Sequence, residues 1–289
     1  MKKYKSKFLL VAGAILMLMS MTGCKNPTDA EGNVKLITTA STFGEVFKED
    51  NWFQGLFVYP MSQAMNYLAP IIGAVGAIAV VTALVQLIVF LLTRKSTVAS
   101  QRMQLIQPEM QKIQKKYEGK KDEVSQMKMA QEMQALYKKY DINPLSSFSM
   151  LLQLPIIFAI FLAVQRCDAI VHGSFLGLSL EQSPWNGMKE GQWLYIVLFG
   201  VMIVAQMASM MLPQWLAKQK AMKAGKKAPD KNPMMSSMYM SMGLILLISI
   251  MWPTAMVVYW IVSSLVNIIK TLSIQMLYLD KDPVGKKGK

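Results

Sequence analysis

Reactive side chains are scarce in this 289-residue sequence. Its two cysteines and single histidine are too few for a disulfide framework or a Cys/His metal cluster. We expect Cys167 to be a packing residue and His172 to be a surface residue. The uncharged apolar stretches hold no carboxylate, and the chain has no P-loop, GxSxG or HExxH motif. These features predict a protein that is not an enzyme and that uses no cofactor or metal.

Cys24 has the clearest chemical role. Residues 1–24 begin with a Lys-rich segment, continue through an apolar core and end in the sequence MTGC. A small-residue pair before Cys resembles a bacterial lipobox, which places a thioether-linked lipid on that Cys. We therefore expect residues 1–23 to be a lipoprotein signal peptide and Cys24 to carry diacylglycerol, with palmitate among its acyl chains. The alternative is an ordinary signal peptide with an incidental Cys.

Side-chain amides recur at one depth in the apolar stretches. Gln86, Gln153 and Gln206 each lie roughly 9–12 Å from the cytoplasmic end of a predicted span. Asn267 lies in the cytoplasmic half of another span. If these side chains face each other, they line a polar concavity within the inner leaflet. The alternative is interhelical hydrogen bonding, which contributes roughly 0.6–2 kcal/mol per contact.

Methionines gather in the second half of the chain, where twelve of the 26 lie between Met202 and Met256. Unbranched thioethers adapt to varied partners, so a Met-rich wall suits transient contact with many hydrophobic helices. The alternative is that these side chains simply face lipid.

The composition indicates which structural elements position these residues. The chain is 53% apolar, 17% charged and carries a net charge of +14, which is too apolar for a soluble protein or a DNA-binding protein. An uncharged aromatic segment at 52–68 predicts an outer interfacial helix. Five stretches are long enough to span a bilayer, the last two separated at Pro253. They are 70–92, 145–165, 193–212, 234–252 and 254–278. The fold class predicted is an all-α membrane protein with five transmembrane helices.

The number of basic residues differs between the segments predicted on the two sides of the membrane. Lys and Arg number eleven in 93–141, six in 213–233 and four in the tail from residue 279, against four in the two outer segments together. The positive-inside rule then predicts the N-terminus outside and the C-terminus in the cytoplasm. The same charge suits an anionic leaflet or ribosomal RNA, unless it only sets topology.

A cytoplasmic helical hairpin is predicted at 94–141. Ile106, Met110, Ile113 and Tyr117 recur at helical spacing, and so do Met129, Met133, Leu136 and Tyr140. The sequence EGKKD at 118–122 separates the two runs. The hairpin is either a solvated link between two spans or a basic arm that meets a ribosome, a targeting factor or an incoming chain.

Two motifs resemble one family. The sequence LLQLPIIF at 151–158 resembles the opening of the second core span in YidC/Oxa/Alb membrane protein insertases. The sequence WPTAMVVYWIVS at 252–263 is similar to the signature of their last span. The order of lipoprotein signal, span, hairpin and four further spans resembles the monoderm bacterial form. The likeness covers about 52–280.

The resemblance implies an insertase and chaperone that moves hydrophobic helices into the cytoplasmic membrane through a polar groove open to cytoplasm and lipid. Gln153, Tyr259 and Trp260 become groove candidates beside Gln86, Gln206 and Asn267. Nascent membrane proteins, lipids, the ribosome and the Sec translocon are the implied partners. The implied parts are an extracytoplasmic segment at 24–68, an insertase core at 69–280 and a basic tail at 281–289.

One residue departs from the family pattern. The family usually has an Arg in its first span, and this sequence has Gln86 there, in TALVQL. An amide keeps the polarity but not the Coulombic attraction of an Arg, and Arg166 is expected at the opposite, outer end of its span. Two other functions stay open on the residues alone. They are a non-catalytic assembly scaffold and a small-solute transporter, although the repeats and charged midplane residues typical of transporters are not seen.

Overall fold

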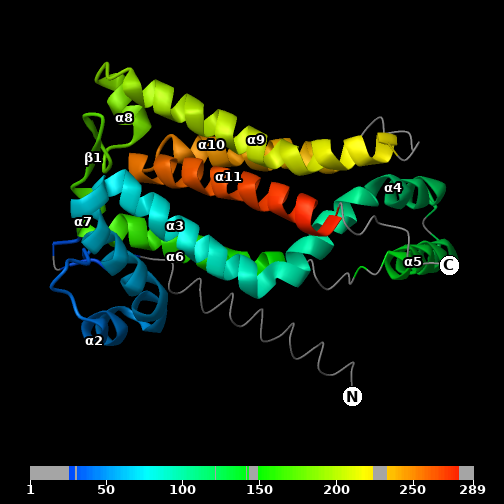
Figure 1. Cartoon of the computed structure of the whole chain (residues 1–289), viewed down its shortest axis with the longest axis horizontal. Helices are drawn as coiled ribbons and strands as arrows, with labels where there is room; N and C mark the ends of the chain where they lie inside the picture. Colours follow the sequence, from blue (N-terminus) through cyan, green and yellow to red (C-terminus); the bar gives the residue numbers. More distant parts are fainter. Residues whose placement is uncertain are drawn as a thin grey trace. The chain divides into compact units, whose positions relative to one another are not determined.

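The computed structural model describes residues 26–29, 31–120, 122–140, 142, 149–223 and 233–279. The predicted signal peptide, Cys24 and the tail at 281–289 lie outside these residues. The described chain is mainly helical (Figure 1). In order, its elements are α2 (Phe43–Glu45), η1 (Val46–Asp50), η2 (Gln54–Val58), α3 (Tyr59–Leu105), α4 (Gln107–Lys116), α5 (Glu123–Lys139), α6 (Ser149–Arg166), α7 (Asp168–Val171), β1 (Ser174–Phe175), β2 (Leu178–Ser179), α8 (Pro184–Lys189), α9 (Leu194–Lys223), α10 (Pro233–Ser249), α11 (Thr254–Ile274) and η4 (Gln275–Leu279).

The long helix α3 joins three segments that the sequence pattern treats separately. It holds residues 59–68 of the predicted interfacial helix, the first predicted span and the start of the predicted hairpin. The bend lies at Gly73, whose φ of 76° and ψ of 161° are non-helical, and not at Pro70. Glycine adopts positive φ without the steric cost that a Cβ brings. Beyond Gly76 no Gly or Pro interrupts the helix, so it continues through the charged residues that follow the membrane span.

Three helical segments of the described chain are long and apolar enough to cross a membrane. They are Gln54–Leu105, Leu194–Lys220 and Thr254–Leu279. These segments correspond to the first, third and fifth predicted spans. The second and fourth predicted spans fall in α6 and α10, of 18 and 17 residues, and their crossing stays a prediction. The protein is an all-α membrane protein, and the count of five spans belongs to the proposal below.

The break predicted at Pro253 separates α10 from α11. Helix α10 ends at Ser249 and α11 begins at Thr254. The first turn of α11 is held by the loop between β2 and α8, because the Thr254 hydroxyl donates to the Gln182 carbonyl oxygen at 2.6 Å. The backbone amide of Thr254 donates to the same oxygen at 2.9 Å. These bonds satisfy donors that a helix start leaves free.

The chain forms two compact units. Unit 1 contains residues 1–85, 151–200 and 248–262, and unit 2 contains residues 86–150, 201–247 and 263–289. The larger buried apolar cluster lies in unit 1, where Ile37, Ile78, Leu162 and Met256 are fully buried. Several helices therefore contribute residues to both units, and the predicted site residues divide between them.

The arm of unit 2, which the sequence predicts to be cytoplasmic, contains α4 and α5, and these helices lie side by side (Figure 1). Its first helix, α4, is shorter than the predicted hairpin arm, because residues up to Leu105 belong to α3 and the chain turns at Ile106. Ile106, Leu136 and Tyr140 form its buried apolar centre. The Tyr140 hydroxyl also donates to the Glu109 carboxylate at 2.6 Å, which adds a polar tie between the two helices.

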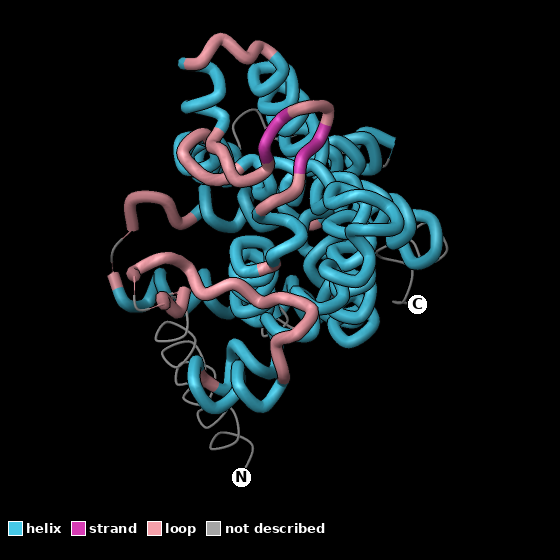
Figure 2. The backbone as a smooth tube through the Cα atoms, turned by 90° about the vertical axis from the view of Figure 1, so that its left-hand side faces the viewer, coloured by secondary structure: helices cyan, strands magenta, loops and turns pink. Residues whose placement is uncertain are grey.

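A short antiparallel hairpin in unit 1 was not expected from the sequence. Strands β1 and β2 pair Ser174 with Ser179 and Phe175 with Leu178 (Figure 2). The two connecting residues, Leu176 and Gly177, have φ of 53° and 81°, the backbone of a tight hairpin turn. Two-residue strands carry too little periodicity for a sequence pattern to reveal them.

Candidate functional site

Two amide–hydroxyl pairs connect α11 to α3 and to α9 within unit 2. The Gln86 amide nitrogen donates to the Ser263 hydroxyl at 2.8 Å. The Ser264 hydroxyl donates to the Gln206 amide oxygen at 2.6 Å. Consecutive residues of α11 thus bind partners on two different helices, and Ser264 is buried while both glutamines are half-buried. The sequence predicted the two glutamines but not their serine partners.

These bonds support the alternative interpretation of the predicted amides, which is hydrogen bonding between helices. Each bond uses only one end of its amide. The Gln86 oxygen and the Gln206 nitrogen have no hydrogen-bond partner among the described residues. Both side chains keep some exposure. The pairs therefore orient two amides and leave each with a free polar end.

Asn267 lies four residues after Ser263 on α11, which places both on one face of the helix. It is half-buried and makes no hydrogen bond with a described residue. A small hollow lies near the C-terminal ends of α3, α9 and α11 in the same unit. Its polar lining comes from Gln101, Gln104, Thr271 and Gln275, none of which the sequence pattern had indicated.

The three candidates suggested by the family motifs lie in unit 1. Tyr259 is buried, and the ring of Trp260 lies 5.5 Å from its ring, centroid to centroid. The indole nitrogen of Trp260 is buried without a hydrogen-bond partner among the described residues. Gln153 belongs to α6, but its side chain lies outside the described part. Their role as groove residues therefore stays a prediction.

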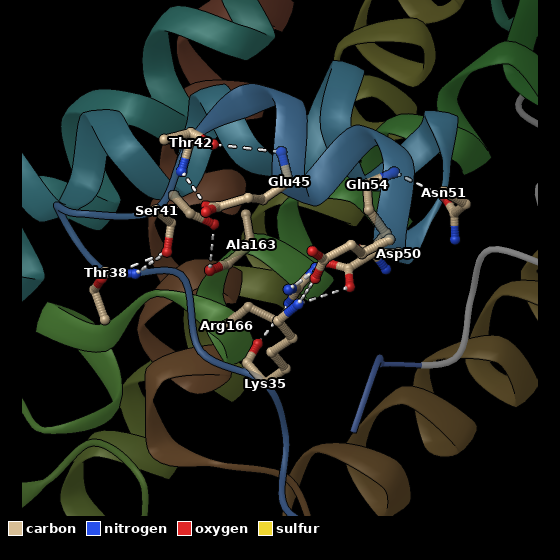
Figure 3. A network of polar contacts seen from close by, with 12 residues as sticks. Lys35, Thr38, Ser41, Thr42, Glu45, Asp50, Asn51, Gln54, Ala163 and Arg166 are labelled. Atoms are coloured by element: carbon tan, nitrogen blue, oxygen red, sulfur yellow. Dashed lines mark hydrogen bonds and ion pairs between the residues drawn. The ribbon is translucent and has the colours of Figure 1, made fainter. Parts of the chain in front are cut away.

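Arg166 forms a buried polar cluster that sequence reasoning missed (Figure 3). At the end of α6 its guanidinium donates to Asp50 at 2.7 Å, to the Gln54 side-chain oxygen at 2.9 Å and to the Lys35 carbonyl oxygen at 2.8 Å. The Arg166 side chain is 0% exposed and that of Asp50 is 3% exposed. The sequence feature that could have predicted this cluster is a single Arg at the end of an apolar helix. Because its donors are engaged and buried, this cation is not available to an incoming chain.

Backbone contacts continue that cluster along the segment around Ile37. The Ile37 amide donates to the Arg166 carbonyl oxygen at 2.6 Å, and the Asp168 amide donates to the Ile37 carbonyl oxygen at 3.2 Å. The buried Asn66 side chain donates to the same Ile37 oxygen at 2.6 Å. The segment around Ile37 is thus attached to the end of α6 and to α3 by hydrogen bonds from both.

Cys167 and His172, for which the sequence predicted no chemical role, are in different environments. Cys167 is buried, and its thiol donates to the Asn66 side-chain oxygen at 3.0 Å. Burial raises the pKa of Cys167 to about 12, so the thiol stays protonated at neutral pH. His172 is exposed but does have an acidic neighbour, the Asp168 carboxylate at 3.1 Å. Among the described residues no three His, Cys, Asp or Glu side chains gather as metal ligands.

Comparison with known proteins places the chain in a family. The sequence model of the 60Kd inner membrane protein matches residues 67–281. The membrane protein insertase MisCA of Bacillus subtilis strain 168 is 31% identical over 284 residues, which cover 97% of this chain and 98% of the relative.

Two further relatives give the same assignment. Membrane protein insertase YidC 2 of Bacillus anthracis is 30% identical, over 99% of this chain and 97% of its own length. Membrane protein insertase YidC 1 of Streptococcus pyogenes serotype M3 is 32% identical, over 82% and 79%. With its apolar helices, the chain is a multi-pass protein of the cell membrane, and it belongs to the 60Kd inner membrane protein family, that of the YidC-type membrane protein insertases.

Proposed function

We propose that this protein inserts hydrophobic helices into the cytoplasmic membrane and assists their folding. Its clients are nascent membrane proteins, and the path is a polar groove open to cytoplasm and lipid. Gln86, Gln153, Gln206 and Asn267 supply the polar groups of the groove, with Tyr259 and Trp260 as aromatic contacts. The relatives' names as insertases support this function.

The observation that carries the groove is that Gln86 and Gln206, although oriented by Ser263 and Ser264, each keep one polar end without a partner among the described residues. Polar side chains in membrane-spanning helices are kept where they face one another or a wet cavity. Each bonded amide retains one free polar end with some exposure. A client's polar segment would exchange hydrogen bonds with these ends and so avoid part of the cost of entering hydrocarbon.

Burial of the client helix supplies the driving force. Each apolar side chain that leaves water contributes about 1.5–3 kcal/mol, whereas one charged residue at the bilayer centre costs about 2.5–3.5 kcal/mol on the insertion scale. Five or six apolar side chains therefore outweigh a short polar tail. Insertion on this basis needs no cofactor and no bond chemistry.

The topology and partners complete the proposal. The N-terminus is outside, anchored by a lipid on Cys24, and five spans end in a cytoplasmic C-terminus. The basic arm and tail meet the ribosome and the Sec translocon, since both carry the excess of Lys and Arg. An intact-mass measurement of the purified protein tests the anchor, because a mature chain that begins at an unmodified residue other than Cys24 would contradict it.

Rescue of a bacterium depleted of its own insertase tests the function. The wild-type gene should restore growth, and Gln86→Leu combined with Gln153→Leu should impair it, because two polar groups are lost from the groove. The matched control is Gln131→Leu with Gln134→Leu, two exposed amides on α5, which should rescue fully. Full rescue by the groove variant would refute the groove.

Photo-crosslinking separates insertion from scaffolding. A photoreactive amino acid at Gln153 should give adducts with ribosome-bound nascent chains during synthesis. Adducts with mature membrane proteins alone would show an assembly scaffold and overturn the proposal.

A further inference from the structure

The tip of the β1–β2 hairpin presents a large apolar side chain on a strained backbone (Figure 2). Leu176 has a φ of 53° and is the sole non-glycine residue with a left-handed φ in the part of the chain that the structure describes. Its side chain is 71% exposed. Two-residue hairpin turns favour Asn-Gly, because asparagine tolerates positive φ whereas a bulky residue is strained there. The Leu176 side chain therefore causes strain and gains little from contacts within the protein.

The base of the hairpin, in contrast, is fixed to unit 1. Leu178 and Leu180 are buried, and Phe175 packs against the main apolar cluster. The Leu180 carbonyl oxygen accepts a hydrogen bond at 2.9 Å from the Ala255 amide in the first turn of α11. A firmly attached base thus holds the apolar tip, and the position of the tip is coupled to the start of α11.

The hairpin lies near the start of the first predicted span. Gly173, just before β1, packs so closely on α3 that a Cβ at this position would lie 2.7 Å from the Ala74 Cβ. Ala74 follows the bend in α3, and the side chains of Ile71 and Ile72 before the bend are exposed. Three residues reach at most about 11 Å. The Leu176 backbone therefore stays within that distance of Gly173 and close to this end of the span.

The hairpin carries no charge, although charged residues precede and follow it. Residues 173–180, with the sequence GSFLGLSL, include no Asp, Glu, Lys, Arg or His. Asp168 precedes this stretch and Glu181 follows it. An uncharged turn can enter a bilayer without the cost of desolvating an ionic group. The residues on either side would pay that cost, so the hairpin is the part of the loop suited to contact with lipid.

We propose that Leu176 is an apolar anchor, and that the hairpin tip enters the leaflet at this end of α3. In the proposed topology this is the outer leaflet. Contact with acyl chains removes the Leu176 side chain from water, and this gain offsets the backbone strain. Because the base is attached to α3 and α11, the anchor fixes the depth of these helices in the bilayer. The inference requires a membrane-embedded protein and does not depend on the insertion of clients.

Lipid fits this tip better than a protein partner does. A stable protein interface buries about 800 Å² on each partner, and a two-residue tip offers far less. The same connection between α6 and α9 ends in Trp193, which is exposed and directly precedes α9. Tryptophan is enriched where a span meets the membrane surface. The exposed Ile71 and Ile72 make the neighbouring end of α3 apolar as well.

The test uses the full-length protein in liposomes with the dye nitrobenzoxadiazole attached to a cysteine on the hairpin. Ser174→Cys places the dye at an exposed position two residues from the tip and keeps Leu176. Glu181→Cys, exposed in the charged part of the loop, is the matched control. The protein without either substitution, taken through the same labelling, gives the background from Cys24 and Cys167.

The quenching of the dye reports its surroundings. The dye at position 174 should be quenched by phosphatidylcholine that carries a nitroxide near the top of its acyl chain, and only weakly by iodide in the water. The dye at position 181 should show the reverse. This difference is expected because the tip carries its neighbours into the leaflet while the charged part of the loop stays hydrated.

Variants of the tip test whether Leu176 causes the contact. Leu176→Met keeps an apolar side chain and should keep the lipid quenching at position 174. Leu176→Asn supplies the favoured Asn-Gly turn and removes the apolar side chain. With it, lipid quenching at position 174 should fall to the level at position 181. The melting temperature of Leu176→Asn in detergent should be no lower than that of the unsubstituted protein, because the strain is relieved.

Four results would overturn the inference. Iodide quenching as strong at position 174 as at 181 would place the tip in water. Quenching by neither agent would show that protein covers the tip, as a second copy of the chain could. Lipid quenching that persists in Leu176→Asn would show that this side chain is not the anchor. A lower melting temperature for Leu176→Asn would show that Leu176 serves packing within the protein.

Discussion

Replacing Arg166 by Met should release the segment around Ile37 from the end of α6. The substitution removes three hydrogen bonds and leaves the Asp50 carboxylate buried without its main partner. Breaking one side of a buried ion pair costs about 3–5 kcal/mol. The Lys35 ammonium, 3.6 Å from the other Asp50 oxygen, offsets part of this loss. We therefore expect about 3 kcal/mol, which raises the population of the undocked segment roughly a hundredfold.

Hydrogen exchange in detergent micelles or nanodiscs measures this release directly. The reporters are the Ile37 and Asp168 amides, which are bonded across the junction at 2.6 and 3.2 Å. Both should exchange about a hundredfold faster in Arg166→Met if opening limits exchange. Lys35→Met is the matched control. It removes the exposed pair with Glu49 and the longer contact with Asp50, but it keeps the Arg166–Asp50 pair and the carbonyl that Arg166 uses. The change should therefore stay within about 1 kcal/mol.

A double variant separates charge from packing. Arg166→Met combined with Asp50→Leu buries no unpaired charge and should recover much of the lost protection. The reasoning is refuted if Arg166→Met leaves both amides protected, or if the double variant loses as much as the two single variants added together.

Three further outcomes follow from the same structure. Gln86→Leu and Ser263→Ala should each lower the thermal stability in detergent by about 1 kcal/mol. The double variant should lose no more stability than either single variant. Additive losses would show that the two side chains do not interact. Gly73→Ala should destabilise the protein by about 1 kcal/mol, because a φ of 76° strains an L residue although open space surrounds the position. The control is Gly200→Ala on α9, which also has open space but an ordinary φ. This control should not lower the melting temperature. Cys167 should resist maleimide at pH 8 until the protein is unfolded. Rapid labelling of the native protein would contradict this. Folding raises the pKa of the Cys167 thiol to about 12. The contribution of the buried thiol to stability should therefore be complete at neutral pH and decline above about pH 9, where only the unfolded thiol ionises.

Local features of this protein were readable from the sequence. Pro253 ends one apolar stretch and begins another, because proline cannot continue the preceding helix. The charged, Gly-containing run at 118–122 separates α4 from α5. The apolar stretches likewise predicted the long helices. Each signal depends only on neighbours along the chain, so no tertiary contact was needed to interpret it.

The tertiary structure decided which polar residues are partners. Gln86 and Ser263 are 177 positions apart, and Arg166 and Asp50 are 116 apart. No periodicity relates such residues, because their contact depends on how separate helices pack. Packing also determined that the Arg166 cation is buried and neutralised by Asp50. The sequence shows the charge of Arg166, and only the fold brings a carboxylate to it.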